Sequence, residues 1–248
     1  MRFTASDGLS GVRGILLLAV ATAFSAAAQA PEDLRLALVI GNGAYPGPAA
    51  LVNPANDAAA MSASLRTLGF QVTELRDASA AQMRDAVAQV RAKLQGKRAV
   101  GMLYYAGHGL QVDFRNYMVP VDARLAGAAD VPGQTIDVGQ VIDAFKAAGN
   151  RMNIVVLDAC RDNPFAQGAS GKGLAPLDAP SGTLLAYATA PGNVAEDGDP
   201  GTGNGLYTSF LVKELQKPAA RIEDVFKRVR LQVRQVSQGR QIPWESTS

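Results

Sequence analysis

A single histidine and a single cysteine, His108 and Cys160, are the side chains best suited to covalent chemistry. His108 lies between two glycines in the segment Tyr-Tyr-Ala-Gly-His-Gly, and Cys160 ends the segment Leu-Asp-Ala-Cys. Cysteine attacks as the thiolate, and a neighbouring imidazole raises the thiolate fraction above that of a free thiol near neutral pH. The same imidazole can protonate a leaving amine. Brought together, the two residues could therefore cleave an amide bond.

Backbone N–H groups beside these two residues could stabilise the negative oxygen of such a reaction. The glycines that flank His108 let the chain approach a substrate closely. We expect the N–H groups of Gly109 and Cys160 to form an oxyanion hole. The neighbours of Cys160, which include Asp158 and Arg161, are polar and argue against a thiol that is merely packed in an apolar core.

The elements that must position these residues follow an alternating pattern from Arg35 onward. Short apolar runs predict strands at 36–40, 70–75, 99–105, 117–121, 153–157 and 183–188, and amphipathic stretches predict helices at 55–68, 79–94, 138–148, 206–215 and 222–236. This alternation predicts an α/β fold with a mostly parallel sheet and helices on both faces. Ligands bind outside the carboxyl ends of the strands in such sheets. Because His108 and Cys160 each follow a predicted core strand, we expect them at the same edge.

Composition excludes several classes of function. The chain has 248 residues, 48% of them hydrophobic and 19% charged, as is ordinary for a globular protein. Its net charge of +2 provides no basic excess for a nucleic-acid partner. One cysteine and one histidine exclude a disulfide framework and any zinc site built from several such ligands.

The first 30 residues have the pattern of a secretory signal peptide. Arg2 and Arg13 precede an apolar run at 15–24, which gives way to small residues that end at Ala30. The run is shorter than the roughly 20 residues that a membrane-spanning helix needs. We expect a signal peptide at 1–30 and one domain at 31–248, exported to a periplasm or secreted, with no stable membrane insertion after cleavage.

Two other enzyme classes fit the sequence poorly. Gly41-Asn42-Gly43 follows the first predicted strand, but Pro46 occupies the position where a dinucleotide-binding loop has its third glycine. The segment Gly168-Ala169-Ser170 has Lys172 where the nucleophile elbow of a serine hydrolase has its second glycine.

Three segments together resemble a known family of peptidases. They are Leu38-Val39-Ile40-Gly41-Asn42, Tyr104-Tyr105-Ala106-Gly107-His108-Gly109 and Leu157-Asp158-Ala159-Cys160-Arg161. In this order they resemble the caspase-like cysteine peptidases, in the branch of paracaspases, metacaspases and their bacterial relatives. The resemblance runs from about Arg35 to the end of the chain. It implies a three-layer caspase-like fold, His108 and Cys160 as the catalytic pair, and protein or peptide substrates.

The resemblance also implies a specificity for basic residues. Paracaspases and metacaspases cleave after Arg or Lys and place acidic residues in the primary pocket. Matched by motif, Asp57 and Asp158 fall on two pocket acids, and Asp197 or its neighbour Glu196 falls on the third. Carboxylates that converge on one pocket repel each other unless a cation fills it, and a substrate guanidinium suits that demand.

Three questions stay open at this point. Metacaspases often need calcium, but Asp137, Asp143 and Asp178 form no recognisable calcium loop, so we expect no metal or cofactor and leave calcium dependence open. Self-cleavage after Lys172, within the segment 166–182, is compatible with the resemblance. The alternative to an enzyme is a catalytically silent peptide-binding or scaffold module, although such relatives typically lose the cysteine or histidine that this chain keeps.

Overall fold

The structure is a computed structural model that describes residues 33–159, 173–190, 195, 203–218 and 220–248. The chain divides into two units, 1–32 and 33–248, and every described residue belongs to the second. The predicted signal peptide therefore lies outside the described residues. In the described part, no helix is both long and apolar enough to cross a membrane.

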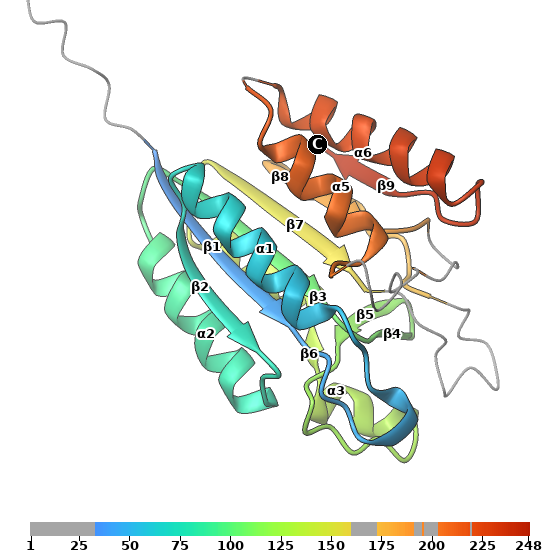
Figure 1. Ribbon diagram of the computed structural model, residues 1–248. Coiled ribbons are helices and arrows are strands. Elements are labelled where there is room, and N and C mark those ends of the chain that lie inside the picture. The colour runs from blue at the N-terminus through green and yellow to red at the C-terminus, as the bar shows by residue number, and fades with distance from the viewer. Residues whose placement is uncertain (1–32, 160–172, 191–194, 196–202, 219) are drawn as a thin grey trace, which may run out of the picture. The chain divides into compact units, whose positions relative to one another are not determined.

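A six-stranded sheet forms the centre of the described unit, in the order β2-β1-β3-β7-β8-β9 (Figure 1). Its strands are β1 (Leu34–Gly41), β2 (Gln71–Arg76), β3 (Ala99–Ala106), β7 (Met152–Asp158), β8 (Thr183–Tyr187) and β9 (Trp244–Thr247). The first five run parallel and β9 runs antiparallel to β8. Residues 36–40 of β1 are all at most 3% exposed, as expected of a strand covered on both faces.

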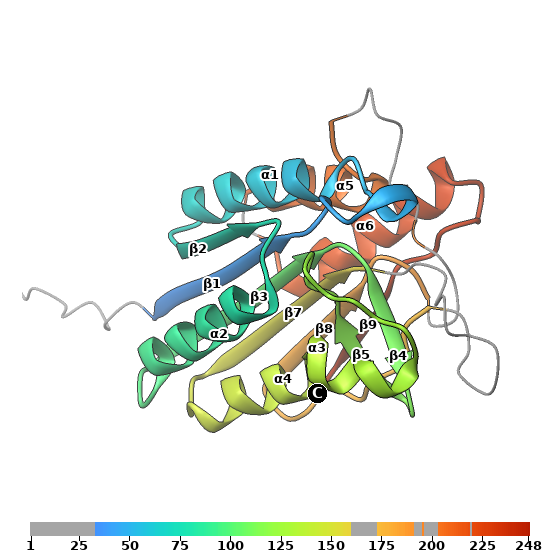
Figure 2. The same cartoon turned by 90° about the horizontal axis from the view of Figure 1, so that it is seen from below.

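Helices cover both faces of this sheet, which confirms the predicted three-layer α/β fold. Figure 2 shows α1 (Pro54–Thr67), α5 (Leu206–Leu215) and α6 (Ile222–Val236) on one face, and α2 (Ala80–Leu94) and α4 (Val138–Ala147) on the other. A capping box begins α2: the Ser79 hydroxyl accepts the Gln82 N–H, and the Gln82 side chain accepts the Ser79 N–H.

A small antiparallel sheet follows β3 along the chain. It contains β4 (Gly109–Val112), β5 (Arg115–Met118) and β6 (Ile136–Asp137), and the short helix α3 (Val131–Gln134) precedes β6. Asp113 and Phe114 join β4 to β5 with φ of 50° and 60°, the backbone of a tight two-residue hairpin turn. The strand predicted at 117–121 is thus β5 at 115–118, and β4 lies in a segment for which the sequence predicted no strand.

The last strand, β9, was not expected from the sequence. It adds to the edge of β8, and the buried Gln241 just before it donates from Nε2 to the carbonyl of Ala188 at 2.8 Å. Arg230 of α6 forms an ion pair with Glu245 of β9. The C-terminal segment therefore packs on the domain.

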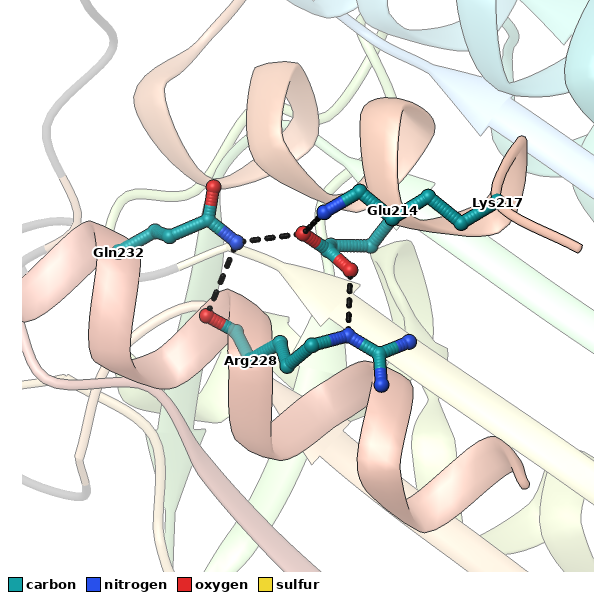
Figure 3. Close-up of polar contacts among 4 residues, drawn as sticks. All are labelled: Glu214, Lys217, Arg228 and Gln232. Atoms are coloured by element: carbon teal, nitrogen blue, oxygen red, sulfur yellow. Dashed lines mark hydrogen bonds and ion pairs between the residues drawn. The ribbon is translucent and has the colours of Figure 1, made fainter. Parts of the chain in front are cut away.

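A buried carboxylate joins α5 to α6 (Figure 3). The side chain of Glu214 is 1% exposed and accepts hydrogen bonds from Lys217 at 2.5 Å, Arg228 at 2.6 Å and Gln232 at 2.6 Å. Burial alone would raise the pKa of Glu214, but these three donors outweigh it and lower the pKa to about 2. Glu214 is thus ionised whenever the protein is folded near neutral pH.

Candidate active site

The carboxyl ends of β3 and β7 bring the two predicted catalytic segments side by side. Ala106 and Asp158 are register partners at the ends of these parallel strands. The Gly107 N–H donates to the Asp158 carbonyl at 3.3 Å, one residue beyond β3. His108 follows Ala106 by two positions, and Cys160 follows Asp158 by the same two positions in the sequence.

The chain after His108 packs against the residue that precedes Cys160. A Cβ on Gly109 would lie 3.1 Å from the Cβ of Ala159 and 3.1 Å from a methyl carbon of Leu174, so a side chain at this position would crowd both neighbours. Ala159 is the last described residue before Cys160, which itself lies outside the described residues.

The pairing of β4 with β5 fixes the direction of the Gly109 N–H. The Val119 N–H donates to the His108 carbonyl at 3.0 Å, so these two residues form a hydrogen-bonded pair where β4 meets β5. The next pair, Gly109 and Met118, is then of the non-hydrogen-bonded kind. The Gly109 N–H is therefore directed away from β5, toward the outer edge of β4.

The imidazole of His108 is held through one of its two nitrogens. Nε2 lies 2.6 Å from the carbonyl oxygen of Ala49, in the short 3-10 helix Gly47–Ala49 that follows β1. A carbonyl oxygen only accepts, so Nε2 carries the proton in this hydrogen bond. In the neutral ring the lone pair is then on Nδ1, and Nδ1 is the atom that can take a proton from a thiol.

Two buried tyrosines position the backbone of His108. The Tyr45 hydroxyl accepts the His108 N–H at 3.1 Å and donates to the Val119 carbonyl at 2.8 Å, and the Tyr45 ring lies 4.4 Å from the imidazole. The Tyr105 hydroxyl donates to the His108 carbonyl at 2.7 Å. Burial is the main cause that raises the pKa of Tyr45 to about 12, so this hydroxyl keeps its proton at neutral pH.

Gly107 leaves room for both tyrosine hydroxyls. A Cβ at this position would lie 2.7 Å from the Tyr105 oxygen and 2.9 Å from the Tyr45 oxygen, closer than real Cβ contacts allow, and its φ is +152°. The two tyrosine hydroxyls therefore leave no space for a side chain at position 107, which explains the glycine before His108.

Asp57 is a buried carboxylate in the first turn of α1. It is 2% exposed and accepts hydrogen bonds from the Asn204 side-chain amide and from the Gly205 N–H, both at 2.9 Å. These donors come from the start of α5, so the N-terminal end of α5 lies directly against the predicted pocket acid.

Asp158, the second predicted pocket acid, is half-buried at the end of β7. It accepts the Thr208 hydroxyl at 2.7 Å, and the Tyr104 hydroxyl lies 2.5 Å from the same Thr208 oxygen. Thr208 therefore donates to Asp158 and accepts from Tyr104. Burial raises the pKa of Tyr104 most, and the charges of Asp57 and Asp158 both raise it further. The two carboxylates thus act on the same buried hydroxyl beside α5.

The remaining predicted residues lie outside the described part of the chain. They are Cys160, both candidates for the third acid, Glu196 and Asp197, and the predicted cleavage position Lys172. Their roles stay predictions. Among the described residues, no cluster of three or more His, Cys, Asp or Glu side chains could hold a metal ion.

Comparison with known proteins establishes the family. The family model described as the caspase domain matches residues 34–248. The chain belongs to the caspase domain family. Mucosa-associated lymphoid tissue lymphoma translocation protein 1 of Homo sapiens is 31% identical over 182 residues, which are 73% of this chain and 22% of that protein. Its Mus musculus homolog is 30% identical over 182 residues, 73% of this chain and 21% of that protein. This caspase-family chain spans about a fifth of the length of these relatives.

The match confirms the resemblance drawn from the three sequence motifs. The chain is a member of a cysteine peptidase family, and its six-stranded sheet with helices on both faces agrees with a caspase-like α/β fold.

Sequence reasoning missed several residues that support the site in this caspase-family fold. Tyr45 lies directly after the quoted segment at 38–42 and a Gly-Ala pair, but no spacing indicated that its hydroxyl would reach His108. Asn204 precedes the glycine that begins α5, a position where a polar side chain could have been suspected of capping, and here it binds Asp57 instead. Ala49 contributes only its carbonyl, which no side-chain pattern can indicate.

Proposed function

We propose that this caspase-family chain is a cysteine endopeptidase that cleaves peptide bonds after Arg or Lys. The Cys160 thiolate attacks the carbonyl carbon of the scissile bond, and the N–H groups of Gly109 and Cys160 stabilise the oxyanion that forms. His108 transfers a proton to the leaving amine as the C–N bond breaks, which leaves a thioester on Cys160. Water then hydrolyses the thioester, releases the acid product and restores the thiol.

The observation that carries this proposal is the pairing of the segments after β3 and β7. Parallel neighbours end at the same edge of a sheet, and the Gly107 to Asp158 hydrogen bond continues the pairing past the strands. His108 follows Ala106 by two residues and Cys160 follows its register partner Asp158 by two residues. These equal offsets support the proposal that the base and the nucleophile lie at one level of that edge.

The anchoring of the imidazole supports its role as the base. With Nε2 donating to Ala49, the neutral ring accepts the thiol proton at Nδ1 and the resulting cation keeps the Ala49 bond. One nitrogen therefore holds the ring while the other exchanges protons.

The acidic surroundings of Tyr104 support a basic residue in the primary pocket. The charges of Asp57 on α1 and Asp158 on β7 both raise the pKa of this hydroxyl. We assign Asp197, or Glu196 beside it, as the third acid. The donors that bind this pair from the start of α5, Asn204, Gly205 and Thr208, are all neutral. A guanidinium can bind two carboxylates at once through its five N–H donors.

We also propose that residues 1–30 direct export to a periplasm or the outside, where protein or peptide substrates with Arg or Lys are the partners, without nucleic acid. We propose no cofactor, and the assay includes calcium as a variable. Mass measurement of the protein recovered from the exported fraction tests the cut near Ala30, and a full-length mass there would contradict export with cleavage.

The test of the proposed activity uses peptidyl-Arg, peptidyl-Lys and peptidyl-Asp reporter substrates under reducing conditions, with and without calcium. We expect cleavage of the first two by the wild type and none by Cys160→Ala or His108→Ala. An Asp158→Asn variant should lose activity on the basic substrates, whereas Asp143→Asn, on the exposed face of α4, should not. Equal inertness of wild type and Cys160→Ala would overturn the peptidase assignment, and a preference for peptidyl-Asp would overturn the pocket assignment alone.

A further inference from the structure

A groove lies on the opposite face of the sheet from α1, α5 and α6. It runs between α2 and α4, which Figure 2 shows side by side on that face, and β5 and β6 form part of its wall. Its volume is about 300 Å³, enough for a small organic molecule. His108, Asp57 and Asp158 do not line it, so the groove is separate from the described part of the candidate active site.

The groove is lined by three arginines and one carboxylate, which leaves an excess of positive charge. Arg115 forms an ion pair with the carboxylate, Asp137. Arg84 donates to the backbone carbonyls of Gly133 at 2.9 Å and of residue 135 at 3.5 Å, so its charge is not neutralised by an acid. In the described part of the chain, Arg91 forms neither an ion pair nor a side-chain hydrogen bond. Among the residues that the structure describes, two of the three guanidinium groups therefore lack a carboxylate counterion.

A buried tyrosine in the same wall provides a second, independent sign of a ligand. Tyr117 is 4% exposed and lines the groove, yet its hydroxyl makes no hydrogen bond with any described residue. The hydroxyl oxygen is not among the fully enclosed side-chain atoms, so a molecule in the groove can reach it. Burial and the charge of Asp137 raise the pKa of Tyr117, so the group remains a protonated donor. A hydrogen-bond acceptor in the groove would satisfy it.

The helices contribute apolar walls between these donors. Val87 and Ala88 face the groove from α2, and Val141 and Ala144 face it from α4. A small inorganic ion would leave these aliphatic surfaces wet, whereas an organic ligand would cover them.

We propose that the groove between α2 and α4 binds a small organic anion whose carboxylate or phosphate oxygens contact the arginines and whose apolar body lies between the helices. Guanidinium groups match the planar oxygens of either anion with paired hydrogen bonds. The Tyr117 hydroxyl is the expected third donor. This site is independent of the proposed peptidase activity and does not require it.

The test is calorimetric titration of the full chain at constant ionic strength with four probes. Phenylacetate and phenyl phosphate carry the two anions on the same apolar ring, 2-phenylethanol is neutral, and inorganic phosphate lacks the ring. We expect saturable binding of at least one aromatic anion, about tenfold or more tighter than that of the two incomplete probes, the size of a charge-assisted hydrogen bond. Which aromatic anion binds more tightly distinguishes a carboxylate ligand from a phosphate ligand.

Three variants locate the binding. Arg91→Gln and Tyr117→Phe each remove a group without a protein hydrogen bond, so both should fold normally, and we expect each to weaken binding several-fold or more. Lys93→Gln removes a neighbouring charge on α2 that does not line the groove and should leave binding unchanged. The proposal is overturned if neither aromatic anion binds saturably, or if Arg91→Gln and Tyr117→Phe bind the anion as tightly as Lys93→Gln does.

Discussion

Replacement of Glu214 by glutamine should destabilise the fold by about 2 kcal/mol at neutral pH. Lowering the pKa of this carboxyl from 4.5 to about 2 corresponds to about 3 kcal/mol of unfolding free energy. Its cationic partners are partly exposed, Lys217 at 55% and Arg228 at 37%, so solvent screening reduces the figure. Glutamine keeps the size of the side chain and removes its charge.

The effect has a defined dependence on pH. Because folding lowers the pKa of Glu214, its stabilisation is complete above the unfolded pKa near 4.5 and is lost as the pH falls toward 2. The difference in unfolding free energy between wild type and Glu214→Gln should therefore shrink between about pH 6 and about pH 3. Urea unfolding followed by circular dichroism measures that difference at each pH.

Glu223→Gln is the matched control on the same pair of helices. Glu223 is 43% exposed and lies 3.9 Å from Arg221, a surface pair whose loss should change stability by less than about 0.5 kcal/mol. The reasoning fails if Glu214→Gln costs no more than Glu223→Gln, or if the cost of Glu214→Gln is the same at both ends of the pH range.

Three further substitutions test the supports of the candidate site. Tyr45→Phe removes the acceptor of the His108 N–H but keeps the aromatic ring. We expect kcat on a peptidyl-Arg substrate to fall about tenfold with KM little changed. An unaltered kcat would contradict a positioning role for the Tyr45 hydroxyl. Thr208→Val removes the donor to Asp158, so KM for the same substrate should rise. The rate of Cys160 alkylation by iodoacetamide should stay the same. An unchanged KM would count against Asp158 as part of the substrate pocket. Gly107→Ala places a Cβ within 3 Å of two hydroxyl oxygens and should lower the free energy of unfolding by about 1–3 kcal/mol, measured by thermal denaturation. A wild-type midpoint would show that the two tyrosines move aside.

The core of the sheet could be predicted from the sequence because buried parallel strands have a simple signature. The runs at 36–40 and 153–157 are continuously apolar, as strands covered on both faces must be, and they fall within β1 and β7. The helices α5 and α6 have the bounds predicted from the sequence, 206–215 and 222–236. The pattern is clearest in α6, whose apolar and charged residues lie on separate faces.

The shorter strands could not be predicted because their pairing is decided by partners far away in the chain. Residues 109–112 contain no apolar run, and they form β4 because a hairpin brings them against β5. Residues 244–247 form β9 because β8 presents an open edge on which they can add. Local sequence carries little information about either event.

The same distinction explains why the candidate base His108 could be proposed from the sequence, whereas the residues that hydrogen-bond to it and to the predicted pocket acids could not. The parallel register of β3 and β7 brings Ala106 and Asp158 to one level at the sheet edge, and in the sequence His108 and Cys160 follow these two residues by the same offset. The contacts that Asn204 makes with Asp57 and Thr208 makes with Asp158, in contrast, depend on how α5 packs over the sheet. The spacing of a sequence can therefore indicate which residues follow the ends of neighbouring parallel strands, whereas the hydrogen bonds that covering helices make at the same edge depend on how those helices pack.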